Sequence, residues 1–425
     1  MIMNNSKSKF IDKILNYRHL KIYFAIYLSI FFLNILYNLV NIFIFPELSI
    51  KFKTFLFYPE DRFADFFKFG AAFSNFKLSP ELLNIGFIDK YLTNNPYLSD
   101  ISIYHQPPLP FSIYVLIGFI SQIFNIFYFF FIFVFFLLIS IARIIIKHSH
   151  KYKNEILLCF FSSYPLIFMV DRGHILSLIA FIFLLLSIIY ISSNKNRYGI
   201  LFMALAICMR PTFFIFSLIF LTVKKSNLNL FFNNIIKLVI VGAIISFVLY
   251  VILNNQFYTD YNLQNILNGL NIYKINYIEN SGGQNYGTSF YFFISLFTNS
   301  PLIIGTFIAL TLLANIFLFF QIPFRNGNLA LHLFLLINLV FIVTPVNADY
   351  YLLLYFIPLY LVLASRININ DAQSSLIVII SSMLIAPKNY YIEDITVGSS
   401  INVIIILISS VFISLNLKNL LKSNT

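Results

Sequence analysis

Long apolar segments with few charged residues recur along most of the chain. Each approaches the ~20 residues that a helix needs to cross the hydrocarbon core of a bilayer. Of 425 residues, 60% are hydrophobic, while 28 are Lys or Arg and 16 are Asp or Glu. A soluble globular protein has about a quarter of its residues charged. The sequence therefore predicts an integral membrane protein.

The residue pattern inside these segments indicates helices. Only helices and closed barrels satisfy their backbone hydrogen bonds in lipid, and continuous runs of Leu, Ile and Phe lack the alternation of barrel strands. We therefore predict an all-α polytopic fold in which residues 1–425 form a single membrane domain with about 12 transmembrane helices. The expected crossings are residues 22–45, 127–146, 156–170, 175–192, 198–209, 211–223, 235–253, 302–322, 329–344, 351–365, 376–387 and 401–416.

The distribution of charge predicts the orientation. With both termini in the cytoplasm, the inner side holds 18 basic and three acidic residues, and the outer side holds 10 basic and 13 acidic residues. The net charge of +12 then divides into +15 inside and −3 outside, as the positive-inside rule requires. Residues 108–123 open with prolines and are short for a crossing, so we expect them to lie at the outer interface. The basic residues are scattered at segment ends, which argues against a nucleic-acid partner.

Two hydrophilic regions are expected on the extracytoplasmic side. The first loop covers residues 46–123 and carries interfacial helices, and the second covers residues 254–300. The second loop either closes over an acceptor or only links two spans. Cys159 and Cys208 lie in apolar segments and are expected to be small core or lipid-facing residues. No His or acidic cluster has metal-ligand spacing, so we expect neither a metal nor a cofactor.

The first loop contains a predicted amphipathic helix at residues 59–73. Its phenylalanines share one face, and Asp61, Asp65 and Lys68 share the polar face. One interpretation is a helix on the membrane surface with solvated charges. The other is that a carboxylate of this helix acts as a catalytic base, and the spacing alone does not decide between them.

Arg210 stands between two apolar stretches. An arginine at membrane depth costs about 2.5–3.5 kcal/mol unless it has a partner, so such residues usually belong to a functional site. The structural alternative is that Arg210 snorkels to the surface or pairs with Asp349. Asp349 and Tyr350 open a later span, where they contact substrate or where the tyrosine is an ordinary interfacial aromatic.

Four short pieces of the chain resemble a known family. They are Asp65-Phe-Phe-Lys-Phe-Gly-Ala-Ala, Asn95-Pro-Tyr with Pro107-Pro108-Leu109, Arg172-Gly-His, and Met209-Arg-Pro-Thr. In this order they resemble the polyprenol-phosphate-sugar-dependent glycosyltransferases of the GT-C superfamily, and within them glycosyltransferase family 87. Members usually carry Gly-Gln or Gly-Asn at the third piece and Lys-Pro-Thr at the fourth. The pieces are short and lie between Asp65 and Thr212, an interval of about a third of the chain.

The resemblance implies a transferase of the bacterial cytoplasmic membrane with an extracytoplasmic active site. It would move a hexose, most often mannose in the family, from a polyprenyl phosphate donor to a lipid-linked or other envelope glycan acceptor. Asp65 is then the candidate general base, with Asp61 as the second carboxylate. Arg210, Arg172 and Arg62 are candidates for holding the phosphate, since a guanidinium binds phosphate through two parallel hydrogen bonds. The remaining candidate substrate-binding residues are His105, Gln106, His174, Asp349 and Tyr350.

Two other classes remain open. An O-antigen polymerase or ligase also joins lipid-linked sugars, but such enzymes usually place their main catalytic loop late in the chain. A lipid-linked glycan transporter would be expected to line a path through several spans with polar residues. Here the ionisable residues gather at the outer ends of the expected spans, which favours the glycosyltransferase.

Overall fold

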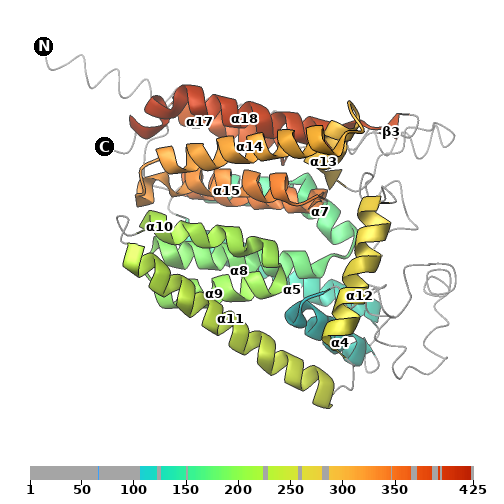
Figure 1. Ribbon diagram of the computed structural model, residues 1–425. Coiled ribbons are helices and arrows are strands. Elements are labelled where there is room, and N and C mark those ends of the chain that lie inside the picture. Colours follow the sequence, from blue (N-terminus) through green and yellow to red (C-terminus); the bar gives the residue numbers. More distant parts are fainter. Residues whose placement is uncertain are drawn as a thin grey trace, which may run out of the picture.

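The computed structural model describes residues 66, 106–121, 126–149, 152–223, 228–256, 261–279, 287–345, 347–364, 371–384, 391–392 and 395–422. Within these ranges the chain is almost wholly helical, with two short antiparallel strand pairs (Figure 1). This confirms the expected all-α membrane class.

The elements fall into an N-terminal and a C-terminal group. The first comprises α4 (Pro108–Ser121), α5 (Ile126–His148), α6 (Lys153–Phe161), α7 (Tyr164–Asp171), α8 (Ile175–Ser192), α9 (Asn196–Met209), the 3-10 helix η5 (Pro211–Ile219), α10 (Phe220–Val223) and α11 (Leu228–Gln256). The second comprises α12 (Leu263–Lys274), the π-helix η6 (Ile275–Glu279), β1 (Gly287–Thr288), α13 (Phe290–Ser295), α14 (Pro301–Gln321), η8 (Asn326–Asn328), α15 (Leu329–Val343), β2 (Asn347–Ala348), η9 (Asp349–Tyr355), α16 (Phe356–Ala364), α17 (Asp371–Ser382), β3 (Tyr391–Ile392), β4 (Ile395–Thr396) and α18 (Val397–Lys422).

Five of the described helices are long and apolar enough to cross a membrane. They are Tyr128–His148, Ile175–Ser192, Leu228–Asn255, Pro301–Gln321 and Ile401–Lys418. The pair α6 and α7 is bent by 50° and would add a sixth span if it crosses as one unit. Other expected crossings are short apolar helices, among them α9 and α15. The chain is thus polytopic, but the expected count of 12 is not confirmed, and residues 22–45 lie outside the described ranges.

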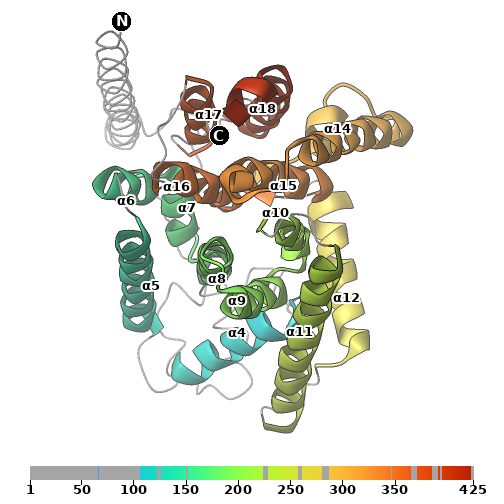
Figure 2. The same ribbon diagram turned by 90° about the vertical axis from the view of Figure 1, so that its left-hand side faces the viewer.

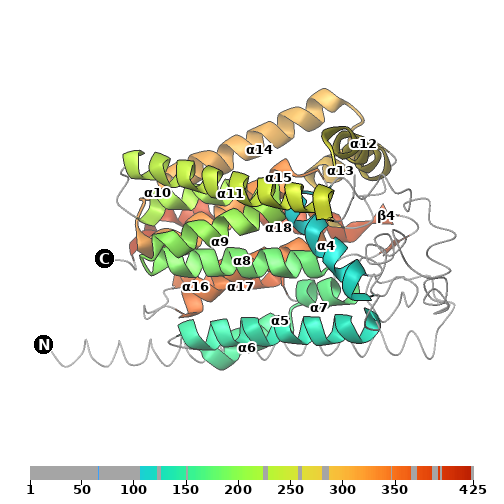
Figure 3. The same cartoon turned by 90° about the horizontal axis from the view of Figure 1, so that it is seen from below.

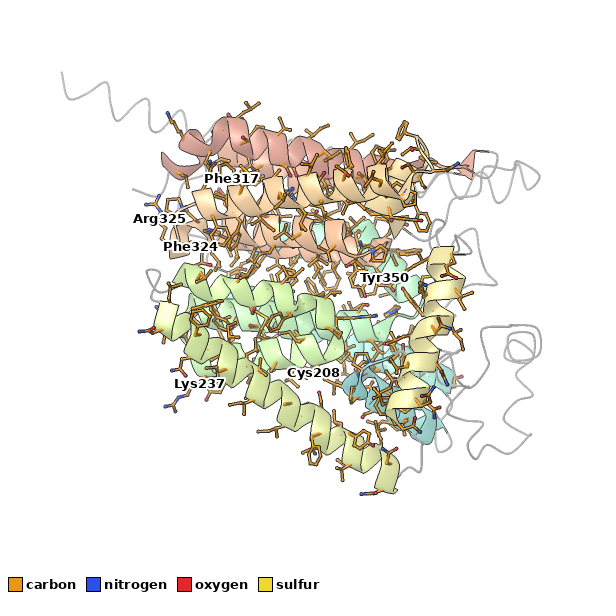
Figure 4. The ribbon with its side chains drawn as sticks, viewed as in Figure 1. Cys208, Lys237, Phe317, Phe324, Arg325 and Tyr350 are labelled. Atoms are coloured by element: carbon orange, nitrogen blue, oxygen red, sulfur yellow. The ribbon has the colours of Figure 1, made fainter. Side chains whose placement is uncertain are left out.

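The helical bundle has two different ends. α4 and α12 run across the direction of α8 at one end, where α7 and α13 also lie (Figures 1 and 2). We call this the α12 end. Tyr350 lies at the α12 end, whereas Lys237 and Arg325 lie at the opposite end (Figure 4). The position of α4 across the bundle agrees with the prediction that residues 108–123 do not form an ordinary span (Figure 3).

Burial separates the core helices from those that face lipid. α8 and α15 are apolar on all sides and are buried along most of their length, as expected for helices enclosed by others. By contrast, α11 and α14 expose many large side chains, including Phe247, Leu310 and Phe317. The two cysteines are free and buried, as predicted.

A cluster of polar side chains joins four elements inside the bundle. Asn338 of α15 donates to Asn315 of α14 and to Ser409 and Ser410 of α18, each at 3.4 Å. The hydroxyl of Tyr355 in η9 donates to Asn338 Oδ1 at 2.8 Å. Hydrogen bonds between side chains of neighbouring helices hold helices together in lipid. This cluster therefore fixes η9 against α15.

Two contacts hold the loops of the α12 end in place. β1 pairs with β2, with Gly287 opposite Ala348 and Thr288 opposite Asn347, so the second loop is bonded to the residues just before Asp349. The hydroxyl of Tyr261, at the start of the same loop, donates to the carbonyl oxygen of Gln106 at 2.7 Å. These contacts connect the second loop to η9 and to α4.

Candidate functional site

Arg210 lies at the break between α9 and η5, and Pro211 explains the break. A proline disfavours helical conformation in the residue before it, and Arg210 is extended, with φ −144° and ψ 99°. At 1.5 Å per residue the 14 residues of α9 span about 21 Å, which is less than the ~30 Å of bilayer hydrocarbon. The half-buried Arg210 is therefore held within the bundle instead of at the end of a full-length span.

The guanidinium of Arg210 contacts the beginning of α8. Its Nη2 lies 3.1 Å from Nε2 of His174 and donates to Oγ of Ser177 at 3.2 Å. His174 and Ser177 are both buried. Two of the predicted substrate-binding residues, 36 positions apart in sequence, thus meet in the structure.

A tight turn brings His174 to this place. At the end of α7, the N–H of His174 bonds to the carbonyl of Met169 and that of Gly173 to the carbonyl of Val170, the two bonds of a Schellman motif. Gly173 has φ 71°, a conformation that suits glycine. His174 is then the N-cap of α8, where its side chain accepts from the N–H of Ser177. The positive end of the α8 dipole points toward the site.

His174 has one donor and one acceptor nitrogen for two contacts, because a neutral imidazole carries a single N–H. Nδ1 lies 3.3 Å from the backbone nitrogen of Ser177, whose N–H also bonds to the carbonyl oxygen of His174 at 3.2 Å. Arg210 is a donor at all of its nitrogens, so Nε2 accepts from it in the tautomer with hydrogen on Nδ1. In the other tautomer Nδ1 caps α8 and Nε2–H is a donor beside the guanidinium, where an anionic oxygen would accept from both.

Tyrosines surround the guanidinium. The ring of Tyr351 lies 5.5 Å from Arg210 Cζ, and the ring of Tyr350 lies 4.4 Å from the imidazole of His174. Tyr114 of α4 and Tyr273 of α12 are also close enough to act on Arg210 electrostatically. A tyrosine hydroxyl is uncharged at neutral pH and can donate a hydrogen bond. Within the described ranges, the electrostatic neighbours of Arg210 thus include no carboxylate.

Tyr273 belongs to the α12 helix outside the spanning segments. Burial and, to a lesser extent, nearby Tyr351 raise its pKa to about 12, and the positive charge of Arg210 opposes the rise. The hydroxyl of Tyr273 therefore keeps its proton throughout the physiological range. It remains a neutral donor beside Arg210.

Asp349 is not the ion-pair partner of Arg210 that the sequence left open as an alternative. Its buried carboxylate accepts a hydrogen bond from the hydroxyl of Tyr164 at 3.3 Å. It does not form the ion pair with Arg210, whose polar contacts are His174 and Ser177. The Tyr164 ring stacks on Phe168, which stacks on Tyr350. Asp349 thus anchors the start of η9, the element that carries Tyr350 and Tyr351.

Two other predicted residues lie in the described ranges. Arg172 is the C-cap of α7, and its partly exposed side chain precedes His174 by two positions. Gln106 is buried just before α4, where its carbonyl oxygen accepts from Tyr261. The described hydrogen bonds of Arg210 go to His174 and Ser177. We name Arg210, His174, Ser177, Tyr350 and Tyr351 the Arg210 centre.

The remaining predicted residues, Asp61, Arg62, Asp65 and His105, lie outside the described ranges. Phe66, next to Asp65 in sequence, is described: it is helical and buried, and its ring lies 4.7 Å from that of Phe130 near the start of α5. The rest of the helix predicted at residues 59–73 lies outside the described ranges.

The sequence prediction missed four contributors to this region, namely Ser177, Tyr351, Tyr114 and Tyr273. Ser177 follows His174 by three positions, the spacing at which the side chain of an N-cap residue meets the next turn. This contact could therefore have been predicted from the sequence. Tyr114 and Tyr273 come from α4 and α12 and reach Arg210 only through the tertiary fold.

Comparison with known proteins found no matching family model, no similar curated protein and no similar solved structure. The resemblance to the glycosyltransferases stays a prediction. The function is therefore argued from the Arg210 centre together with the sequence pattern.

Proposed function

We propose that this protein is a membrane glycosyltransferase that moves a hexose from a polyprenyl phosphate donor to a lipid-linked or envelope glycan acceptor on the extracytoplasmic face. One observation carries this proposal: Arg210 is a cation inside a membrane protein, and the described neighbours of Arg210 are neutral. A phosphate on a lipid anchor is the anion that reaches such a place from within the bilayer.

The proposed role of the Arg210 centre is to hold the donor phosphate. As the bond from the anomeric carbon to the phosphate oxygen breaks, negative charge accumulates on that oxygen. Fixed donors aimed at developing charge are often the largest contribution to catalysis. Arg210 Nη2 is the donor proposed for this task, and His174 adds a second in the tautomer that carries hydrogen on Nε2. A hydrogen bond to a charged group contributes about 1.5–3 kcal/mol.

The proposed base is Asp65, which the family resemblance assigns. The acceptor hydroxyl oxygen attacks the anomeric carbon from the face opposite to the phosphate, so the configuration inverts. Its proton passes to the carboxylate of Asp65, and polyprenyl phosphate leaves with the electron pair of the broken bond. Asp61 falls in the first turn of the predicted helix, where the helix dipole already accounts for a carboxylate.

The transporter alternative receives less support than the transferase. A transport path needs polar groups that face an open route through the membrane. The buried side chains of Asn315, Asn338, Tyr355 and Ser410 are uncharged and hydrogen-bonded to one another. These side chains hold helices together, whereas the cation of the described site is Arg210.

The proposal is tested with purified protein, polyprenyl-phosphate-linked labelled mannose and a lipid extract as the source of acceptor. Loss of a general base slows a reaction by ~10²–10⁴-fold, so Asp65→Asn should abolish detectable transfer. Asp61→Asn is the matched control and should cost only a small part of the rate. Full activity in both variants would remove this helix from catalysis, and activity lost only in Asp61→Asn would reverse the assignment.

A further inference from the structure

α12 has a face that the rest of the described chain leaves uncovered. Leu263, Leu267 and Leu270 follow one another at i, i+4 and i+7, so they form one stripe along the helix. Their exposed fractions are 71%, 52% and 46%. An exposed leucine stripe on a helix outside the spanning segments needs an apolar environment that covers it.

A neighbouring side of α12, which carries Ile266, Gly269 and Tyr273, faces the bundle. Gly269 is buried, Ile266 packs against the core, and Tyr273 lies close to Tyr351 and Arg210. This packing fixes the rotation of α12 about its axis. The leucine stripe stays exposed beside it.

The exposed stripe continues a surface that already faces lipid. α11, which precedes α12, exposes Phe247, Tyr250 and Ile252 toward its C-terminal end. Beyond α12, the chain exposes Phe297 and then Leu302 at the start of α14. α12 lies across the bundle at the end where these residues occur (Figures 1 and 2).

We propose that α12 is an interfacial helix whose Leu263, Leu267 and Leu270 insert into the lipid surface at the α12 end, and that this docking holds Tyr273 beside Arg210. The composition fits a helix at a membrane surface, since the stripe is flanked by polar Gln264 and Asn271 and ends at Lys274. The ammonium of Lys274, at the end of the stripe, lies 2.8 Å from the carboxylate of Glu279, and this exposed ion pair belongs to the polar side of the interface. The docking surface does not depend on the proposed sugar transfer.

Fluorescence quenching tests the docking directly, because the chain contains no tryptophan. Leu267→Trp, Leu270→Trp and, as a control from the flank of the same helix, Gln264→Trp are each reconstituted in phosphatidylcholine vesicles. The quencher is phosphatidylcholine brominated near the top of one acyl chain. Phe247→Trp on the lipid-facing side of α11 is the positive reference.

We expect Leu267→Trp and Leu270→Trp to be quenched at least about twofold more than Gln264→Trp, and to approach the Phe247→Trp reference. Equal quenching at positions 264, 267 and 270 would overturn the proposal. So would a blue-shifted but unquenched signal at 267 and 270, which would show that protein, such as a second copy of the chain, covers the stripe. Leu270→Trp also guards against a folding defect specific to position 267.

Discussion

Nη2 of Arg210 lies 3.1 Å from Nε2 of His174, although the two residues come from different helix termini. In the tautomer with hydrogen on Nδ1, Nε2 accepts from Arg210; in the tautomer that caps α8, Nε2–H is a donor beside the guanidinium, and an anion would accept from both groups. His174 thus has two roles, capping α8 and contacting Arg210.

His174→Asn should preserve both roles, because an asparagine side chain offers a carbonyl oxygen and an N–H₂ group at once. Asparagine is also a preferred N-cap residue. His174→Ala should lower the unfolding free energy by about 1 kcal/mol through loss of the cap. Thermal unfolding in detergent would check this difference, and equal stability of the Ala and Asn variants would show that the cap contributes nothing.

Gly173→Ala should destabilise the turn that presents His174. The φ of 71° places an L-residue in the left-handed region, which costs roughly 1–2 kcal/mol. Gly305→Ala is the control, since a Cβ there meets nothing within 4 Å, and alanine is favoured in a helix interior by about 0.5–1 kcal/mol. A lower melting temperature for the Gly173 variant alone is expected. Similar values for the two variants would contradict the role given to this turn.

Asn338→Leu should loosen the contact between η9, α15 and α18. It removes the hydrogen bond from Tyr355 and those that Asn338 donates to Asn315 and the serines of α18, and interhelical bonds of this kind contribute about 0.5–2 kcal/mol in a membrane. Asn416→Leu is the control, because the side chain of Asn416 bonds only within α18, to Phe412. Denaturant unfolding should show a lower unfolding free energy for Asn338→Leu but not for Asn416→Leu. An equal loss in both variants would show that the cluster does not stabilise the contact.

The charge split predicts the orientation of the bundle, and a labelling experiment tests this prediction. Asn271 of α12 is exposed at the α12 end, and Ser193 is exposed in the turn between α8 and α9. In intact cells an impermeant maleimide should label Asn271→Cys and leave Ser193→Cys unmodified, and the native cysteines are buried. The reverse pattern would invert the proposed topology.

Local signals in the sequence predicted the parts of the site that depend on neighbouring residues. Pro211 ends α9 at Arg210, and the Arg-Gly-His sequence ends α7, so both breaks were readable. The short α4 across the bundle was also predicted from its prolines and from the charge balance. These features depend on backbone conformations that particular residues impose.

Long-range partners were not predictable in the same way. Arg210 was considered as a partner of Asp349, but the packing of α9 on α8 brings it to His174, while Asp349 binds Tyr164. The count of 12 spans is also not confirmed, because five of the described helices are long and apolar enough to cross a membrane, while α9 and α15 are shorter apolar helices. Tertiary packing decides the partner of Arg210.

Binding of a polyprenyl phosphate tests the central claim most directly. Wild type, Arg210→Ala, Arg210→Lys and the control Arg197→Ala, an exposed arginine in the first turn of α9, are compared in nanodiscs. Loss of a charge-assisted hydrogen bond costs about 1.5–3 kcal/mol, so Arg210→Ala should bind at least tenfold more weakly, with Arg210→Lys between it and wild type. Arg197→Ala should bind as wild type does. Unchanged affinity in Arg210→Ala, with the protein folded, would contradict the assignment of the phosphate to Arg210.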